Sequence, residues 1–516
     1  MDQHAIWSIT PPILALVLAI ATRNVLVSLG VGVALGMIIV NGFHLWPGVL
    51  DVFERGIIAQ LTEASNAEMV LIILVIGGFV HLMDRSGGMA AFAQRMTRVV
   101  DSPRKAQLSV WVTGMAIFFT DSGNSVILGP MFRPIFARMR VCREKLAFII
   151  DSTSSPVCVL VPLISWGVYI MSLLEQPFAS LGVTQSPLQA CIRATPFQLY
   201  PILALATVPV LVATGREYGP MARVQRQYLE EEEATKETRE SGAVDDAGGG
   251  EAGAAAVLLP LATVLLILGG LLVYFTVTLE ELPGATVRQS LLVAYLAGTA
   301  VAAVVLVRRR VFTASRTFLL FLAGMRGMAR IVVILVLAWA LGDVCELLGT
   351  GETLAGFFDR GLSPGLIPAL VFVLGAVFSL STGSSWGTFA LLMPIALPMA
   401  HQAGLPLEVT IAAVLSGGVF GDHCSPVSDT TVLSSMATGC DHASHVNTQL
   451  GYAVVTGLST LVGFVIAGFT GWPFVLVPAL ALQVALTLGL TSLRGVPTIW
   501  DHTGHALRPG RCRDDR

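Results

Sequence analysis

The stretch SGGVFGDHCSPVSDTTVLSS, residues 416–435, lies between long apolar runs, yet it carries two aspartates, a histidine and several hydroxyl side chains. A proline, Pro426, interrupts it. Inside a hydrocarbon layer every backbone N–H and C=O needs a partner, so irregular chain persists only where protein buries it or water reaches it. Ionisable side chains at that depth are expensive and mark functional positions. If its surroundings lie in a membrane, the stretch therefore predicts a broken helix at a functional site.

The composition places the chain in a membrane. Of its 516 residues 54% are hydrophobic and 13% charged, and the mean hydropathy is +0.75. A soluble domain carries about 25% charged residues, so a large soluble enzyme would need far more charged surface. We expect an all-α polytopic membrane protein with about 12 transmembrane helices, some of them broken or re-entrant. The candidate spans are residues 7–22, 25–42, 68–84, 106–119, 155–174, 197–213, 254–278, 289–307, 331–348, 364–380, 386–400, 408–420, 449–470 and 473–493.

One charged, glycine-rich segment, residues 214–253, divides the chain into halves of similar length. Its composition is that of a linker. We therefore divide the chain into a first membrane repeat (1–213), the linker, a second membrane repeat (254–495) and a C-terminal tail (496–516).

Basic residues gather in several of the predicted loops and indicate an orientation. Cytoplasmic loops carry an excess of Lys and Arg, whereas the loop near 279–287 is acidic, with Glu280 and Glu281. We expect the linker in the cytoplasm and the N-terminus outside. An odd number of crossings must then precede the linker, which holds if 106–135 forms a re-entrant hairpin. The basic loop residues are Arg23, Arg85, Arg95, Arg98, Arg104, Lys105, Arg133, Arg138, Arg140, Arg143, Lys145, Arg216, Arg223, Arg226, Arg308, Arg309, Arg310, Arg316, Arg326 and Arg330.

The two halves resemble each other weakly. FFTDSGNSVILGPMFRPI (118–135) and SLSTGSSWGTFALLMPI (379–395) each join a Gly/Ser/Thr-rich break, an apolar run and a late proline. DSTSSPVCVLVP (151–162) and DHCSPVSDTTVL (422–433) share an aspartate shortly before Ser-Pro-Val. The order of the two breaks is the same in both halves. Because the N-terminus is expected outside and the linker in the cytoplasm, the two halves start from opposite sides of the membrane. Together with the shared order of the breaks, this predicts two inverted repeats.

The breaks supply an ion-binding chemistry. Gly123 and Gly383 give the backbone freedom, and Pro156 and Pro426 each free a carbonyl by removing a helical donor. Freed carbonyls and helix ends hold ions in transporters built from inverted repeats. Most side chains at the breaks are hard oxygen ligands, which suit Na⁺ or a proton better than a soft metal. The candidate substrate- and ion-binding residues are Asp121, Asn124, Asp151, Ser152, Thr153, Thr382, Ser384, Ser385, Asp422, Ser425, Asp429 and Thr430.

Each of these signals has another interpretation. The hydroxyls can bond back to their own helix, Asp151 can cap a helix start, and Asp429 can pair with an arginine. GSSWG (383–387) matches the G-x-S-x-G nucleophile motif, although that motif needs a strand–turn–helix context. The run from Asp422 to His445 holds metal-ligand residue types, but their spacing matches no regular zinc pattern.

Three segments carry a family resemblance. REKLAFIIDSTSSPVCVLVPLISW (143–166) and FGDHCSPVSDTTVLSS (420–435) closely resemble signatures of the NhaC-type sodium/proton antiporter family, and TDSGNSVILGPMFRP (120–134) is similar to its preceding segment. The resemblance covers about residues 70–470. It implies a multi-pass protein of the bacterial cytoplasmic (inner) membrane that exchanges ions. Some relatives exchange organic acids coupled to Na⁺ or H⁺. The linker has no counterpart that we recognise in the family.

The sequence thus leads to a function and an alternative. We expect a secondary antiporter, not an enzyme, that exchanges Na⁺ for H⁺ because the two ions compete for buried carboxylates. Asp121 and Asp422 are the leading carboxylates and the hypothetical Na⁺ ligands, followed by Asp429. The alternative is an exchanger of organic acids or amino acids coupled to Na⁺ or H⁺.

The expected partners follow from the same reasoning. No phosphate-binding G-x-x-x-x-G-K-[ST] motif is present, so an ion gradient must drive transport, and we expect no cofactor beyond the transported Na⁺ and H⁺. The partners are the lipid bilayer and a small cation or small organic anion. We expect no nucleic acid, and a homodimer is an open alternative for the assembly.

Overall fold

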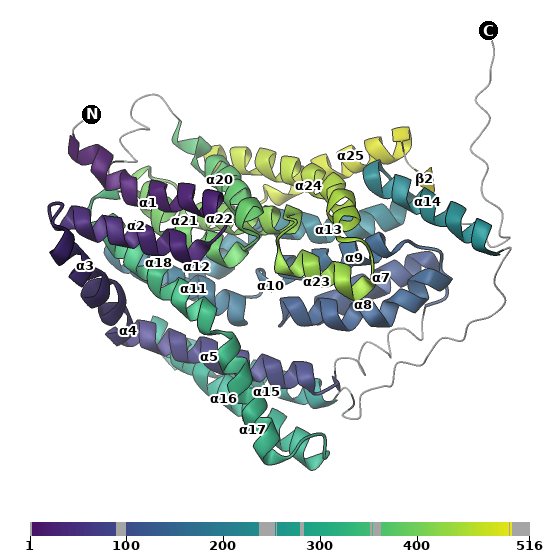
Figure 1. Ribbon diagram of the computed structural model, residues 1–516, viewed down its shortest axis with the longest axis horizontal. Coiled ribbons are helices and arrows are strands. Elements are labelled where there is room, and N and C mark those ends of the chain that lie inside the picture. The colour runs from purple at the N-terminus through teal and green to yellow at the C-terminus, as the bar shows by residue number, and fades with distance from the viewer. Residues whose placement is uncertain are drawn as a thin grey trace, which may run out of the picture.

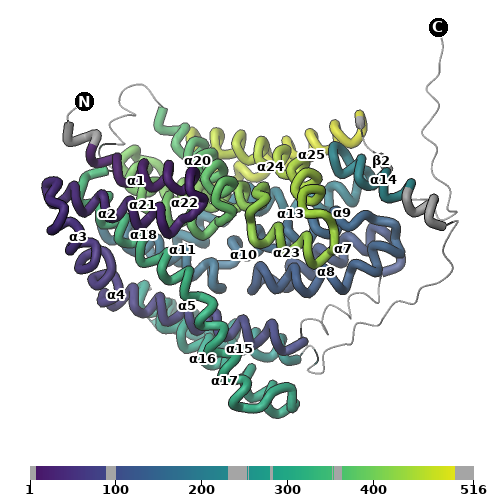
Figure 2. Tube along the Cα trace, in the orientation of Figure 1, coloured from purple at the N-terminus to yellow at the C-terminus, as the bar shows by residue number. Residues whose placement is uncertain are grey.

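The protein is described from a computed structural model that covers residues 3–88, 100–236, 253, 255–278, 283–350, 353, 363–494 and 496–497. It is an elongated bundle of helices, and both the ribbon and the tube show helices such as α13 and α24 running along its long axis (Figure 1, Figure 2). The only strands in the described ranges are two residues each, and they pair antiparallel. The expected all-α membrane fold is therefore confirmed.

The elements fall into two groups, before and after residues 237–252, so β1 and α14 of the predicted linker stand with the first half and β2 of the predicted tail with the second. The first half consists of α1 (Gln3–Thr22), α2 (Val25–Val40), α3 (Leu45–Phe53), η1 (Glu54–Ile58), α4 (Ala59–Thr62), α5 (Ala64–Arg85), α7 (Pro103–Ala116), α8 (Asp121–Arg138), α9 (Arg143–Ser152), α10 (Ser155–Cys158), α11 (Ser165–Ser180), α12 (Pro187–Ala194), η2 (Thr195–Phe197) and α13 (Leu199–Thr214), followed by β1 (Arg216–Glu217) and α14 (Gly219–Lys236). The second half consists of α15 (Ala255–Thr278), α16 (Gly284–Arg308), α17 (Ala314–Gly327), α18 (Ala329–Leu347), η3 (Pro364–Leu366), α20 (Ile367–Thr382), α21 (Ser385–Gln402), α22 (Leu407–Cys424), α23 (Asp429–Thr438), α24 (His442–Thr470), α25 (Leu476–Arg494) and β2 (Val496–Pro497).

Seven helices of the described chain are long and apolar enough to cross a membrane, or eight if the bent pair α12–η2 and α13 counts as one span. The expectation of about 12 spans also includes shorter helices and broken pieces, which this criterion omits, whereas the hairpin arm α20 meets it. One of the seven is the range Ala314–Leu347, which contains α17 and α18 and an apolar window of 18 residues. Arg326 and Arg330, which the sequence analysis placed in a basic loop, lie instead in the last turn of α17 and the first turn of α18, on either side of Met328.

Two helical hairpins enter the bundle and turn back. In the first, α7 has 14 residues, which is roughly 21 Å and shorter than the hydrocarbon core of about 30 Å. It returns as α8, and this pair confirms the re-entrant hairpin predicted over 106–135. The second hairpin consists of α20 and α21, whose turn at Gly383 has a φ of 64°. Glycine adopts this left-handed conformation without steric cost.

The long arms of the two hairpins begin in the same way. Thr120 caps α8 by accepting a hydrogen bond from the backbone N–H of Gly123, at 3.1 Å. Ser384 caps α21 by accepting one from the backbone N–H of Gly387, at 3.3 Å. Both arms are 18 residues long. The hairpins thus repeat one local design, a hydroxyl N-cap followed three residues later by glycine.

The internal prolines fix the register between the two arms. Pro130 and Pro134 interrupt α8, and Pro394 and Pro398 interrupt α21. With the two N-caps superposed, Pro130 corresponds to Pro394 and Pro134 to Pro398. The sequence comparison noted one late proline in each segment, and the structure shows that each arm has two in matching positions.

The hairpins open toward opposite ends of α24, a helix of 29 residues that extends roughly 43 Å. At its N-terminal end Ser444 donates to Glu144, close to where α8 leaves the first hairpin. At its C-terminal end Gly468 approaches the carbonyl of Gly365, where α20 begins. The two hairpins are therefore inverted with respect to each other.

A broken helix accompanies each hairpin. In the first half α9 ends at Ser152, α10 forms one turn, and α11 resumes the direction at Ser165. In the second half α22 ends at Cys424 and α23 begins at Asp429. Pro156 lies at the start of α10 and Pro426 lies in the gap before α23, as expected of residues that cannot donate within a helix.

The halves are interleaved at these breaks. α8 packs against α9 of its own half and α23 of the other, and α21 packs against α22 of its own half and α11 of the other. Ser125 on α8 and Ser434 on α23 share a hydrogen bond of 2.9 Å. Tyr169 on α11 donates to the carbonyl of Trp386 on α21 at 2.8 Å. The site between the halves therefore needs both of them.

The turn between α1 and α2 reaches the tip of the second hairpin. A side-chain carbon at Gly387 would lie 2.4 Å from Val25, so glycine allows this close approach. The other end of α1 lies beside the end of α18, where the hydroxyl of Thr350 donates to the carbonyl of Ser8. Arg23 in this turn is consequently at the depth of the hairpin tip and does not extend a basic loop near the linker.

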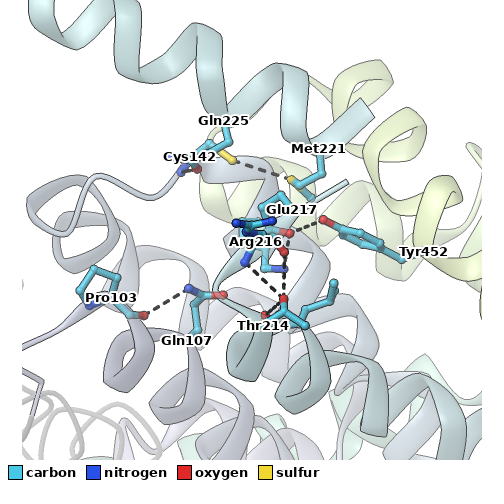
Figure 3. Close-up of polar contacts among 11 residues, drawn as sticks. Pro103, Gln107, Cys142, Thr214, Arg216, Glu217, Met221, Gln225 and Tyr452 are labelled. Atoms are coloured by element: carbon cyan, nitrogen blue, oxygen red, sulfur yellow. Dashed lines mark hydrogen bonds and ion pairs between the residues drawn. The ribbon is translucent and has the colours of Figure 1, made fainter. Parts of the chain in front are cut away.

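The first part of the predicted linker is folded onto the bundle (Figure 3). Glu217 is buried and pairs with the buried Lys145 at 3.0 Å, and it also accepts a hydrogen bond from Tyr452 on α24. On α14, Gln225 accepts from the backbone N–H of Cys142 at 2.9 Å. We call Lys145, Glu217 and Tyr452 the junction cluster. Linker residues 237–252, loop residues Arg95, Arg98, Glu280 and Glu281, and tail residues 498–516 lie outside the described ranges.

Candidate functional site

The two hairpin tips and the two helix breaks meet at one cavity of about 570 Å³. Besides the hairpin tips and the breaks, α5 and α11 of the first half and α17 and α18 of the second half contribute to its walls. Its polar lining consists of His81, Asp84, Thr120, Asp121, Ser122, Ser155, Ser165, Arg330, Thr382, Ser384, Ser385, Asp422, Asp429 and Thr430.

Asp422 is the most deeply buried carboxylate of this lining, with 3% of its surface exposed. Its Oδ2 accepts from the hydroxyl of Ser385 at 3.0 Å and from that of Ser155 at 3.4 Å. Its Oδ1 is also buried, and no described residue supplies it with a hydrogen bond. The two donors come from different halves, so Asp422 holds one satisfied and one unsatisfied oxygen at the repeat interface.

Asp121 and Asp429 occupy the first positions of α8 and α23. Asp121 accepts from the backbone N–H of Ser122 at 2.7 Å and from the indole of Trp166 at 3.2 Å. Asp429 is exposed and accepts from the backbone N–H of Thr430 at 2.9 Å. The positive end of a helix dipole stabilises negative charge at such positions. Both carboxylates thus accept hydrogen bonds from backbone N–H groups at a helix start, whereas Asp422 lies in the last turn of α22.

A further carboxylate comes from the end of α5. The Oδ1 atom of Asp84 is buried without a partner among the described residues. A side-chain carbon at Gly123 would lie 2.7 Å from this oxygen, so glycine lets α5 approach the first turn of α8. His81, one turn earlier on α5, and Arg330 on α18 also line the cavity.

Asp151 does not line the cavity. Its Oδ2 accepts from Thr431 at 3.0 Å and from Gln449 at 2.6 Å. It lies in the last turn of α9, so the alternative that it caps a helix start is wrong. His423 is likewise behind the wall, with ring contacts to Tyr200 at 2.8 Å and Ser152 at 3.3 Å.

The predicted site residues thus separate into two layers. Those that line the cavity are Asp121, Thr382, Ser384, Ser385, Asp422, Asp429 and Thr430. Those that lie behind it, bonded to other parts of the breaks, are Asn124, Asp151, Ser152, Thr153 and Ser425. Asn124 donates to the carbonyl of Thr153 at 2.8 Å, and Ser425 donates to that of Leu380 at 2.8 Å, so both join chain segments across a break.

The sequence analysis missed Asp84, His81, Arg330, Trp166 and Trp386 as cavity residues. A signal existed for Asp84 and His81, because both follow an apolar run directly. Arg330 was assigned to a loop, although the apolar pattern resumes immediately after it. Nothing in the local sequence places the two tryptophans at this wall, which is set by packing between α11 and α21.

The other chemistries considered for these residues find no support in the geometry. Ser385 begins a helix at a helical turn and donates to Asp422, which differs from the strand–turn–helix that a nucleophile elbow requires. Within the described ranges no three His, Cys, Asp or Glu side chains are placed to hold a metal ion. The hypothetical Na⁺ ligands Asp121 and Asp422 line the same cavity from opposite halves.

Comparisons with known proteins agree with this architecture. A model of the Na⁺/H⁺ antiporter family matches residues 4–156 and 157–469. An uncharacterized protein of Haemophilus influenzae is 31% identical over 477 residues, which are 91% of this chain and 92% of that protein. The malate-2H⁺/Na⁺-lactate antiporter of Bacillus subtilis is 32% identical over 142 residues, or 27% of this chain and 30% of that one. The fold of the Alcanivorax borkumensis YdaH transporter is similar, with a TM-score of 0.58 at 16% identity over 83% of this chain and 89% of that one.

The family match spans nearly all of the bundle, including both hairpins and both breaks. It confirms the resemblance found in the sequence and makes the protein a transporter, not an enzyme. The cavity enclosed by inverted hairpins and the family match lead to one conclusion: this chain belongs to the Na⁺/H⁺ antiporter family and is a multi-pass secondary antiporter.

Proposed function

We propose that this antiporter exchanges Na⁺ for H⁺ by competition at Asp422. The observation that carries the proposal is the buried Oδ1 atom, which no described residue satisfies. A buried polar atom without a partner costs about 1–3 kcal/mol, and more when it is charged. A proton or a cation on the carboxylate removes that cost, and each of them disfavours the other.

The surroundings of Asp422 supply further oxygen ligands for a small hard cation. The hydroxyls of Ser385 and Ser155 contact its Oδ2, and Ser385 also lies 3.3 Å from the carbonyl of Gly418. Oxygen ligands of this kind suit Na⁺ better than a soft metal ion. Asp121 and Asp429 line the route to this position and attract cations to it.

The inverted hairpins provide the alternation of access. Each tip touches the cavity while its open end lies toward the opposite side of the bundle. We propose that movement of one hairpin relative to its broken helix exposes Asp422 to one side, and movement of the other exposes it to the other side. Since one carboxylate serves both ions, net exchange follows without a second energy source.

The orientation follows from charge. Arg138, Arg140 and Arg143 lie at the end of the bundle where α14 packs, and the side chain of Arg309 approaches Gly253 at the end of the linker. An excess of basic residues marks the cytoplasmic side. We propose that the protein lies in the bacterial cytoplasmic membrane with the linker inside and the N-terminus outside.

The test uses everted membrane vesicles that contain the full chain and a pH-sensitive dye. Addition of Na⁺ should release the accumulated protons in wild-type vesicles and fail to do so with Asp422→Asn. Asp101→Asn is the matched control, since Asp101 is exposed and lies outside the cavity. An absence of response to Na⁺, Li⁺ and K⁺ in wild-type vesicles would overturn the proposal.

A further inference from the structure

Arg330 is the one Arg or Lys among the described residues that line the cavity. It lies in the first turn of α18, just after Met328, which separates α18 from α17. Its side chain is exposed and lines the cavity. Among the described residues no carboxylate lies within ion-pair distance of it, although Asp84 and Asp121 line the same space.

The cavity has room for a small organic molecule as well as a small cation. Its volume of about 570 Å³ lies within the range of about 300–1,000 Å³ that is typical of small-molecule sites. A water molecule occupies about 30 Å³, so Na⁺ with a few waters fills only part of it. Trp166 and Trp386 line the same wall with ring centroids 5.0 Å apart, and they offer apolar surface to a carbon skeleton.

Arg330 faces a cavity whose other charged groups are aspartates. They come from α5 (Asp84), α8 (Asp121), α22 (Asp422) and α23 (Asp429). A guanidinium forms two parallel hydrogen bonds with a carboxylate, and this geometry makes arginine a specific anchor for that group. We propose that Arg330 binds the carboxylate of a small organic solute inside the cavity. This inference deepens the proposed function, because it assigns a second substrate to the site at Asp422.

The same layout couples the two substrates. An anion that enters the cavity is repelled by every ionised aspartate in the wall and attracted by Arg330. Na⁺ or a proton on Asp422 removes part of that repulsion. The organic anion therefore binds more tightly when the cation site is occupied, and by linkage the cation binds more tightly in the presence of the anion.

The test measures binding of radiolabelled lactate, malate and glutamate to the purified full-length protein, in Na⁺ and in choline buffers. We expect at least one of these carboxylates to bind, and to bind more tightly in Na⁺. Arg330→Gln should weaken that binding by about 10- to 100-fold. Arg330→Lys should give an intermediate loss, since it keeps the charge but not the two-pronged geometry.

Arg326→Gln is the matched control, because Arg326 lies in the last turn of α17 and does not line the cavity. Its carboxylate affinity should equal that of the wild type. Each variant is first checked for a single elution peak and for its thermal unfolding midpoint. Equal binding by Arg330→Gln and Arg326→Gln would overturn the inference, as would a wild-type protein that binds none of the three carboxylates.

The outcomes separate this inference from the proposed function. If wild-type vesicles respond to Na⁺ while no carboxylate binds, exchange at Asp422 stands and the role of Arg330 falls. If carboxylate binding depends on Arg330 but wild-type vesicles do not respond to Na⁺, the role of Arg330 stands and Na⁺/H⁺ exchange falls. Loss of the Na⁺ dependence of carboxylate binding in Asp422→Asn is expected from the coupling between the two.

Discussion

Two acidic side chains, Glu217 and Asp422, are buried to nearly the same extent, with 2% and 3% of their surface exposed, but their surroundings differ. Glu217 in the junction cluster has Lys145 at 3.0 Å and the hydroxyl of Tyr452 on the same oxygen. The ammonium of Lys145 also lies 5.0 Å from the centre of the Tyr452 ring. Asp422 has only hydroxyl donors on one oxygen and no described partner on the other.

The difference shows that burial alone does not identify a transport site. The fold provides a cation for the carboxylate that holds α14 and α24 against α9. Among the described residues no Lys or Arg pairs with Asp422 at the cavity. A protein cation beside Asp422 would occupy the place that we assign to Na⁺ or H⁺, so we regard this difference in partners as the functional feature. Four substitutions test this comparison.

The largest effect is expected at Glu217. Glu217→Ala leaves the charge of Lys145 buried and unpaired, which should cost about 3–5 kcal/mol of stability. The thermal unfolding midpoint of the detergent-purified protein should fall accordingly. Lys145→Met combined with Glu217→Leu removes both charges and should restore most of the loss. If the unfolding midpoint of the double variant stayed low, the ion pair would contribute to stability beyond the mutual neutralisation of its two charges.

Asp422→Asn should affect transport strongly and stability little, in contrast to Glu217→Ala. We expect Na⁺-driven proton movement to fall by about 100-fold, equivalent to about 2.7 kcal/mol, because an amide exchanges neither a proton nor Na⁺. The unfolding midpoint should stay close to that of the wild type, since the substitution removes a buried charge that the described fold leaves unpaired. A large drop in the midpoint would place Asp422 with Glu217 as a structural residue.

Ser385→Ala removes one of the two hydroxyls on Asp422. Its net hydrogen bond to a charged group is worth about 1.5 kcal/mol, so the apparent Na⁺ affinity should weaken by roughly 10-fold. Concentration-dependent dye responses in vesicles measure this change. Ser381→Ala is the control, because Ser381 is half-buried, does not line the cavity and bonds back to its own helix. An equal change in apparent Na⁺ affinity for both substitutions would show that Ser385 has no specific role in ion binding.

The smallest effect is expected for Tyr452→Phe. It removes one hydrogen bond from Glu217 but leaves the ion pair with Lys145 in place, which should cost about 1 kcal/mol of stability. Transport per folded molecule should be unchanged, as measured by the initial rate of the dye response normalised to protein. A transport defect without a change in the unfolding midpoint would connect the junction cluster to the cycle.

Much of the architecture was predictable from local signals. The hairpin at 103–138 and the breaks near Pro156 and Pro426 follow from proline, glycine and hydroxyl residues inside apolar sequence. Arg330 was assigned to a loop because its charge precedes the apolar window that begins at 331, although it lies in the first turn of α18.

The division of the site into two layers was not predictable. Asp151 and Asp422 precede similar Ser-Pro-Val motifs, yet α9 directs one carboxylate to Thr431 and Gln449 while α22 directs the other to the cavity. Which way a side chain points depends on how each helix is rotated by its neighbours. Those neighbours lie far away in the sequence, so spacing within a motif does not reveal them.

The interleaving of the halves also has a consequence for how the protein is made. Ser125 on α8 finds its partner Ser434 on α23 only after 309 further residues have been synthesised. At about 5 to 20 residues per second, the ribosome needs roughly 15 to 60 s for that interval. During this time the first hairpin lacks the surface of α23 that later covers it, and the cavity forms only after α23 has been synthesised.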